Sequence, residues 1–75
     1  MKELTQFIAS RLADKPEAVK VEESLDGDLT VLKLLVDEGD KGKVIGKQGK
    51  VIKAIRSLVS VAASKAGKRT VVEID

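Results

Sequence analysis

The stretch from Lys50 to Gly67 limits the fold of this chain more than any other segment. Its apolar residues recur at three- and four-residue spacing and form one continuous helical stripe: Val51, Ile52, Ile55, Leu58, Val59, Ala62, Ala63 and Ala66. Gly67 stands where a glycine commonly ends a helix, and Lys65 and Lys68 lie near the negative end of the helix dipole. The pattern predicts one long helix with a broad apolar side.

The first half of the chain predicts one helix and a β-hairpin. Apolar residues in 1–13 have helical spacing, and Pro16 ends this helix because proline disfavours the α conformation in the residue before it. Residues 19–25 and 29–36 have the apolar and β-branched content of strands. Asp26-Gly27-Asp28 lies between them as a tight turn, so the two strands are expected to pair antiparallel.

The second half adds a short helix, the long helix and a last strand. Asp40 is expected to be the N-cap of a short helix over residues 41–45, and residues 70–74 are expected to form a strand. In the order α-β-β-α-α-β, the last strand can lie parallel to the second through a right-handed crossover. We therefore expect an α+β fold with three helices on one face of a three-stranded mixed sheet. Leu and Val side chains on the other face would be exposed, which favours self-association.

The composition excludes several classes of function. The 75 residues predict one domain with a small core. Because the chain has no His and no Cys, it cannot form a Ser-His-Asp triad, a Cys-His pair, a His-based zinc site or a disulfide. The apolar runs are too short to span a membrane, and the start Met1-Lys2-Glu3 is unlike a signal peptide. We expect a soluble cytoplasmic protein that is not an enzyme and has no cofactor.

The charges of the chain are divided between its two halves. Residues 1–40 have five basic and ten acidic residues, a net charge of −5, whereas residues 41–75 have nine basic and two acidic residues, a net charge of +7. No acidic residue lies between Lys41 and Val72. A solvated helix face usually mixes both signs, so this separation favours a surface that binds a polyanion.

The segment best suited to a polyanion is Gly46-Lys47-Gln48-Gly49, which separates the short helix from the long one. Two glycines without Cβ atoms let a phosphate backbone come close, and the free N–H groups and positive dipole end of the long helix point to the same place. Lys43 and Lys50 add charge around the loop, and Lys53 and Arg56 continue along the helix at three-residue steps. A plain helix–turn–helix corner is the alternative, but the surrounding cations favour phosphate contact.

Ile45-Gly46-Lys47-Gln48-Gly49-Lys50, followed by an aliphatic helix, resembles the Ile-Gly-x-x-Gly motif of K-homology (KH) domains. The element order matches the bacterial, type II arrangement, and residues 1–75 are similar throughout to the small stand-alone KH proteins of bacteria, the KhpA type. The resemblance implies binding of single-stranded RNA, in which the loop clamps the backbone of about four nucleotides. It also implies that Val44, Ile45 and Ile52 supply part of an aliphatic floor under the bases.

The same resemblance implies a homodimer, or a heterodimer with another KH protein, and a role as an RNA chaperone or post-transcriptional regulator. Phe7 is the one aromatic residue and is expected in the core, so base stacking on aromatic side chains is not available. Base recognition must then rest on aliphatic contacts and hydrogen bonds. We expect weak, modestly selective binding with a strong salt dependence.

Three other interpretations remain open at the level of sequence. Gly42-x3-Gly46-Lys47 is one residue short of a phosphate-binding loop of ATPases, and Gln48 replaces the Ser or Thr that would hold magnesium. A helix-turn-helix DNA-binding protein would place more base-reading side chains on its second helix than Lys50, Lys53 and Arg56. A protein-interaction or dimerisation module is compatible with RNA binding.

Overall fold

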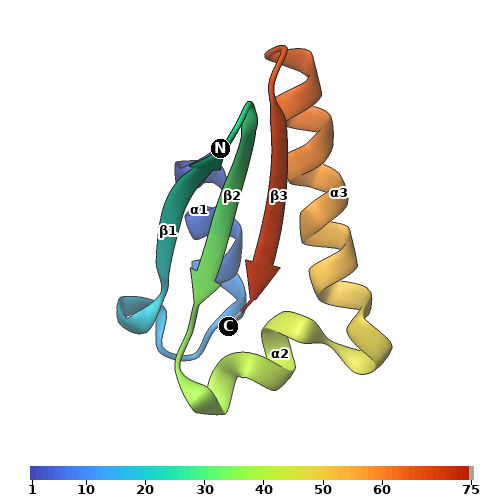
Figure 1. Ribbon diagram of the computed structural model, residues 1–75. Helices are drawn as coiled ribbons and strands as arrows, with labels where there is room; N and C mark the ends of the chain where they lie inside the picture. The colour runs from blue at the N-terminus through green and yellow to red at the C-terminus, as the bar shows by residue number, and fades with distance from the viewer. Residues whose placement is uncertain (75) are drawn as a thin grey trace.

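The computed structural model describes residues 1–74, and Asp75, the last residue of the expected single domain, lies outside the described residues. The elements follow the predicted order (Figure 1): α1 (Lys2–Leu12), β1 (Lys20–Asp26), β2 (Leu29–Leu35), α2 (Lys41–Ile45), α3 (Lys50–Lys65) and β3 (Arg69–Ile74). Three single 3₁₀ turns lie between them: Pro16–Ala18, Glu38–Asp40 and Lys47–Gly49. Within residues 1–74, none of the helices has the length and apolar character needed to cross a bilayer.

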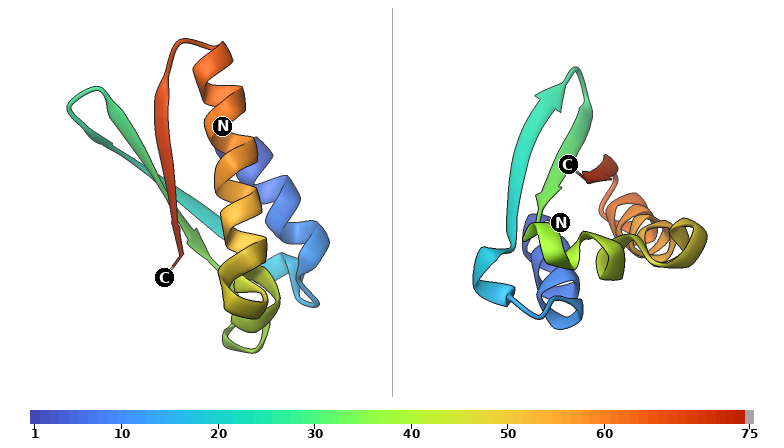
Figure 2. Two further views of the ribbon diagram at one scale, coloured as in Figure 1. Left: turned by 90° about the vertical axis from the view of Figure 1, so that its right-hand side faces the viewer. Right: turned by 90° about the horizontal axis from the view of Figure 1, so that it is seen from below.

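The sheet has the order β1-β2-β3 and is mixed. β1 pairs antiparallel with β2 through the predicted turn, and β2 pairs parallel with β3, with Leu32 opposite Val72. The three α-helices lie on one side of the sheet (Figures 1 and 2). The predicted α+β arrangement is therefore confirmed. α3 ends as expected, since the Lys68 amide donates to the Ala63 carbonyl across Gly67 at 2.8 Å.

The core lies between the inner face of the sheet and the helices. Its fully or nearly buried apolar residues come from every layer: Ala9, Val19, Val21, Leu32, Leu34, Val44, Ile52, Ile55, Val59 and Val72. The stripe on α3 is wider than this core, because Leu58 is 57% exposed. The long helix therefore has apolar surface that the packing against the sheet does not use.

Phe7 is not in the core, so this expectation was wrong: its side chain is 58% exposed, and the Arg11 guanidinium lies 5.0 Å from the ring centroid. α1 instead turns Thr5 and Ala9 inward. Thr5 can be buried because its hydroxyl donates to the Met1 carbonyl at 2.9 Å, which satisfies the polar atom inside the helix. Small residues on this side let α1 lie close to the sheet, and Phe7 is left on the surface.

Asp40 stands at the N-cap position of α2, but its side chain does not cap that helix, which corrects the prediction. Its carboxylate is buried, and it accepts hydrogen bonds from the amides of Asp14 at 3.1 Å and Lys15 at 3.0 Å. The Lys15 amide, helped by the Asp14 amide, lowers the pKa of Asp40, against the opposing effect of burial. Asp40 thus ties α2 to the chain that leaves α1.

This contact predicts an acid-sensitive contribution to stability. A lowered folded-state pKa means that the Asp40 carboxylate stabilises the fold above the ordinary aspartate pKa of about 4, and that this contribution is lost as the pH falls through the lowered value. We expect Asp40→Asn to be less stable to urea at neutral pH, since its amide nitrogen would face a backbone donor. Its stability should also fall less on acidification than that of the wild type. Equal pH dependence of the two proteins would contradict this role.

The outer face of the sheet has no helix over it within residues 1–74 (Figure 2). The expected exposure of its Leu and Val side chains is confirmed for Val71, which is 40% exposed, whereas Leu29, Val31 and Leu35 are half-buried. Lys33 stands in register between Glu22 and Glu73, so the apolar surface is interrupted by charges. Self-association through this face stays a prediction.

Candidate nucleic-acid interface

The loop between α2 and α3 is held by a packing requirement at Gly46. Its backbone has φ +77 and ψ 173, a region that residues with side chains rarely adopt. A Cβ atom at this position would lie 2.4 Å from Cγ2 and 2.9 Å from the amide nitrogen of Val51. Gly46 therefore lets the loop fold back onto the first turn of α3, and this glycine is explained by structure alone.

The two residues at the other end of the loop have left-handed backbone. Gln48 has φ 58 and ψ 26, and Gly49 has φ 74 and ψ 16. Left-handed backbone at Gln48, which is not a glycine, stores strain on the order of 1–2 kcal/mol. The nearest atom to a Cβ at Gly49 would be 3.9 Å away, so there is open space beside it. The exposed side of the loop is thus accessible to a ligand.

The loop amides are less free than expected. The Gly49 amide donates to the Gly46 carbonyl at 3.1 Å, and the Lys50 amide donates to the Lys47 carbonyl. No side chain caps α3. Two amides expected at the phosphate are therefore engaged internally, while the positive end of the helix dipole remains uncovered.

The cations around the loop fall into two groups. Lys47, Lys50 and Lys53 are exposed and form no ion pair within the described part of the chain. Lys43 points elsewhere, because its ammonium group binds the Asp14 carboxylate, and this hydrogen bond raises the pKa of Lys43. The free positive charge of this region thus gathers at the loop and along the first turns of α3.

The three aliphatic residues expected under the bases differ in how far they are exposed to solvent. Val44 is 0% exposed and Ile52 is 5% exposed, and both belong to the core. In this conformation neither offers surface to a base, so their observed contribution is to hold α2 and α3 together behind the loop. Ile45 is partly buried and packs against the core from the loop side.

A groove lies between the later turns of α3 and β3, the edge strand of the sheet. It consists of two adjoining hollows of about 430 Å³ and 290 Å³ that share Ser60, Thr70 and Val71. Arg56 lies in the first hollow, where its Nε donates to the Val72 carbonyl at 2.9 Å, while Ser64, Lys68 and Arg69 line the second.

Sequence reasoning named Arg56 as a cation that continues along the long helix from the loop, but it did not predict this groove or its other residues. The four-residue steps from Arg56 to Ser60 and Ser64 put these three on one helical face, and this spacing is a signal that could have been used. The residues that β3 contributes to the groove could not be predicted in this way, because they depend on which edge strand of the sheet packs beside α3.

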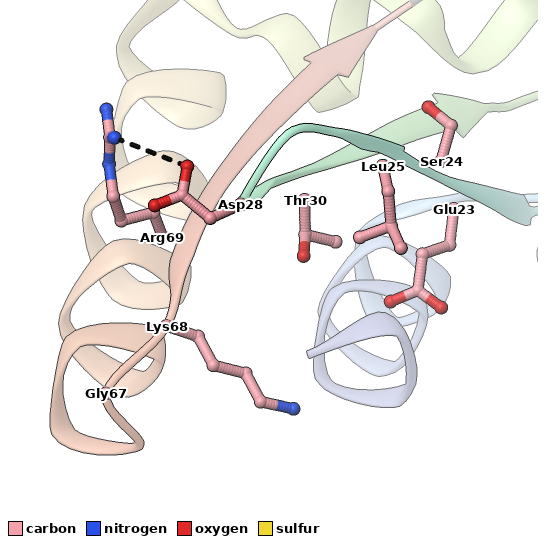
Figure 3. A pocket seen from close by; sticks show the side chains of 8 residues that line it. All are labelled: Glu23, Ser24, Leu25, Asp28, Thr30, Gly67, Lys68 and Arg69. Carbon is pink, nitrogen blue, oxygen red and sulfur yellow. Dashed lines mark ion pairs between the residues drawn. The ribbon is translucent and has the colours of Figure 1, made fainter.

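A larger hollow of about 810 Å³ lies between the hairpin tip and the turn from α3 to β3 (Figure 3). Lys68 points toward its open space, and Arg69 reaches across to Asp28 at 3.8 Å. Because Glu23 and Asp28 are also in its lining, the charges there are balanced. This hollow is less suited to a polyanion than the groove between α3 and β3, whose lining has Arg56, Lys68 and Arg69 and one acidic residue, Glu73.

Three helices on one face of a β1-β2-β3 mixed sheet, with a Gly-x-x-Gly loop between the last two helices, define a KH domain of type II. The family model "KhpA/KhpB, KH domain" matches residues 2–74. The chain belongs to this KhpA/KhpB family.

Two curated relatives match the chain over almost its full length. "RNA-binding protein KhpA" of Clostridium perfringens is 54% identical over 74 residues, which cover 99% of both proteins. "RNA-binding protein KhpA" of Aquifex aeolicus is 40% identical over 75 residues, which cover 99% of this chain and 94% of the relative. Both relatives are bacterial proteins of the same size class as this chain.

Two solved structures of Era have the same fold as this chain. Era of Aquifex aeolicus, a Y63A variant bound to GDP.AlF4-, has a TM-score of 0.63 and 24% identity. Era in complex with MgGDPNP and nucleotides 1506–1542 of 16S ribosomal RNA has a TM-score of 0.57 and 25% identity. In both cases the match covers 97% of this chain and 28% of Era, so the similarity is confined to one part of Era.

Proposed function

We propose that this protein binds single-stranded RNA, with the backbone held at Gly46–Gly49 and the bases in the groove between α3 and β3. The observation that carries the proposal is the group of unpaired cations Lys47, Lys50 and Lys53 at an open loop and the positive end of α3. The names of the KhpA relatives and the rRNA complex of Era support RNA as the polyanion. Neither relative is named as an enzyme, in agreement with the expectation that the chain catalyses no reaction.

The groove suits a flexible strand better than a duplex. α3 extends about 24 Å, since its 16 residues rise about 1.5 Å each, which is enough for about four splayed nucleotides. A major-groove reader would need more base-reading side chains on the outward side of α3 than Lys50 and Ser57. The proposed role is that of an RNA chaperone or post-transcriptional regulator, with a homodimer or a heterodimer with another KH protein as its assembly.

A titration at several salt concentrations tests the function. Three lysine–phosphate contacts predict that the logarithm of the association constant for single-stranded RNA falls with the logarithm of salt concentration with a slope of about −2. Uridine octamers should bind more tightly than a DNA duplex of equal charge. Preference for the duplex would favour the helix-turn-helix interpretation. A slope near zero would show that the three lysines do not contact the phosphates.

The position of the Arg56 guanidinium group predicts a base preference within this groove. Its Nε is fixed by the Val72 carbonyl, which leaves the two terminal nitrogens as a fork of paired donors. Guanine (O6 and N7) and cytosine (O2 and N3) offer two adjacent acceptors, whereas adenine and uracil place a donor beside each acceptor. We expect one guanine or cytosine in a uridine octamer to improve binding by about tenfold over adenine.

Arg56→Lys is the matched variant for this preference, because it keeps the charge and loses the fork. It should bind the plain uridine octamer within about twofold of the wild type and should no longer distinguish the substituted octamers. Retained discrimination would exclude Arg56 as the base reader without affecting the proposed backbone contacts.

A further inference from the structure

A second group of cations lies where the groove between α3 and β3 ends. Lys68 and Arg69 line the hollow beyond the last turn of α3, whereas Lys47, Lys50 and Lys53 lie at the loop and the first turn of this helix. The chain has no acidic residue between these two groups. Positive side chains therefore stand at both ends of the surface that the RNA is proposed to follow.

The part of the groove between the two groups is balanced in charge. In the hollow that Arg56 lines, its positive charge is matched by the negative charge of Glu73. Ser60 and Ser64 of α3 and Thr70 of β3 contribute hydroxyl groups to the lining. Phosphate contacts position a strand and base contacts read it, so cations at both ends with polar groups between them suit a strand that is anchored twice.

The side chains of Lys68 and Arg69 are available to a ligand. Lys68 ends α3 through its backbone amide, which donates to the Ala63 carbonyl, and its side chain points into open space (Figure 3). Nη1 of Arg69 lies 3.8 Å from Oδ1 of Asp28, and these side chains are 72% and 87% exposed. An ion pair this exposed contributes little to stability, so a phosphate can replace Asp28. Glu23 is the other acidic residue in the lining at this end.

The length of α3 determines how much RNA is needed to reach both groups. Its 16 residues rise about 1.5 Å each, and the resulting length of about 24 Å accommodates about four splayed nucleotides. A strand held at Gly46–Gly49 therefore has about four nucleotides beside the helix. Its next phosphates come to the turn between α3 and β3, where Lys68 and Arg69 stand. A tetramer can contact one group of cations, and an octamer can contact both.

We propose that Lys68 and Arg69 form a second phosphate-binding site, which extends the RNA-binding surface from about four to about six to eight nucleotides. This inference rests on the proposed function, since it requires that the loop and the groove bind RNA. It makes the length of the unpaired segment a determinant of affinity. The protein then selects long single-stranded stretches over short loops, even when the bases are the same.

Fluorescence anisotropy with fluorescein-labelled uridine tetramers and octamers tests this length dependence. Lys68→Gln with Arg69→Gln should reduce affinity for the octamer about tenfold at low salt and should leave affinity for the tetramer within about twofold of the wild type. Each phosphate contact on a single strand contributes about −0.7 to the salt slope. The octamer slope of the wild type should therefore be steeper than that of the double variant by about 1.4.

Lys20→Gln with Lys65→Gln is the matched control, because it removes the same two positive charges from other surfaces. Lys20 is exposed on β1, and Lys65 lines the hollow on the α1 side of α3. This variant should bind the octamer within about twofold of the wild type. Asp28→Asn should have the opposite effect to the Lys68 and Arg69 change. Because it releases Arg69, affinity should rise about twofold for the octamer and stay unchanged for the tetramer.

Circular dichroism and urea unfolding establish that each variant is folded before binding is compared. Equal loss of octamer affinity in the two double variants would assign the effect to overall charge. Unchanged octamer affinity in the Lys68 and Arg69 variant would exclude the second site, and an equal loss for the tetramer would exclude its dependence on length. These outcomes overturn the inference while RNA binding by the wild type remains. A wild type that binds neither oligomer would contradict the proposed function itself, and this inference with it.

Discussion

Replacing Gly46 with alanine should destabilise the protein more than any other single substitution in the loop. The added Cβ would lie 2.4 Å from Cγ2 of Val51 and 2.8 Å from its Cβ, and the backbone at φ +77 is strained for any residue with a side chain. The first turn of α3 would have to move away from the loop. We expect a loss of about 3 kcal/mol or more, a large part of the roughly 4–10 kcal/mol available to a domain of this size.

Gly49→Ala is the matched control for this prediction. Gly49 also has a positive φ, +74, but the nearest atom to its added Cβ would be 3.9 Å away. It should therefore lose only the left-handed backbone preference, about 1–2 kcal/mol. Urea unfolding of both variants, monitored by circular dichroism, measures the two losses in the free energy of unfolding. Equal losses would show that backbone conformation alone, and not the contact with Val51, makes glycine necessary at position 46.

The features that could be predicted from sequence are those with a local cause. The order of elements follows from helical and strand spacing and from turn residues such as Gly27 and Gly67, and this order is confirmed. The position of the loop between two helices follows from the spacing of Gly46 and Gly49 in the same way. In each case the residues that specify the feature are neighbours in the chain.

The features that sequence reasoning missed depend on contacts between distant segments. Asp40 looked like a cap for its own helix, but its carboxylate binds amides 25 and 26 residues earlier. Lys43 looked free for phosphate, but it binds Asp14 from the same distant segment. Phe7 lies outside because the rest of the core packs against the side of α1 that has Thr5 and Ala9. None of these partners can be deduced from spacing along one helix.

Contacts between distant segments also decide which sides of α3 are buried and which remain exposed. Its apolar stripe looked like one surface, but the sheet covers only the part around Ile55 and Val59, and Leu58 is left toward α1. Arg56 looked like one more surface cation until β3 placed the Val72 carbonyl beside it. The sequence pattern specifies which residues share a side of the helix, and the tertiary fold decides what each side meets.

The double substitution Lys47→Asp with Gln48→Asp should abolish most RNA binding while the protein stays folded. Both side chains are exposed and form no contact that the core requires. The change places two carboxylates at the proposed phosphate contact and removes one of the three unpaired lysines there. We expect affinity for a uridine octamer at low salt to fall by about 100-fold, which corresponds to about 2.7 kcal/mol, and the salt slope to become shallower.

Lys20→Asp with Ser24→Asp controls for charge, since this pair changes the net charge by the same −3 on the exposed outer side of β1. If the loop is the site, this control should lose only the small, long-range part of the attraction, about twofold at moderate salt. RNA affinity that falls equally in both double variants would mean that overall charge, and not the Gly46–Gly49 loop, attracts the strand.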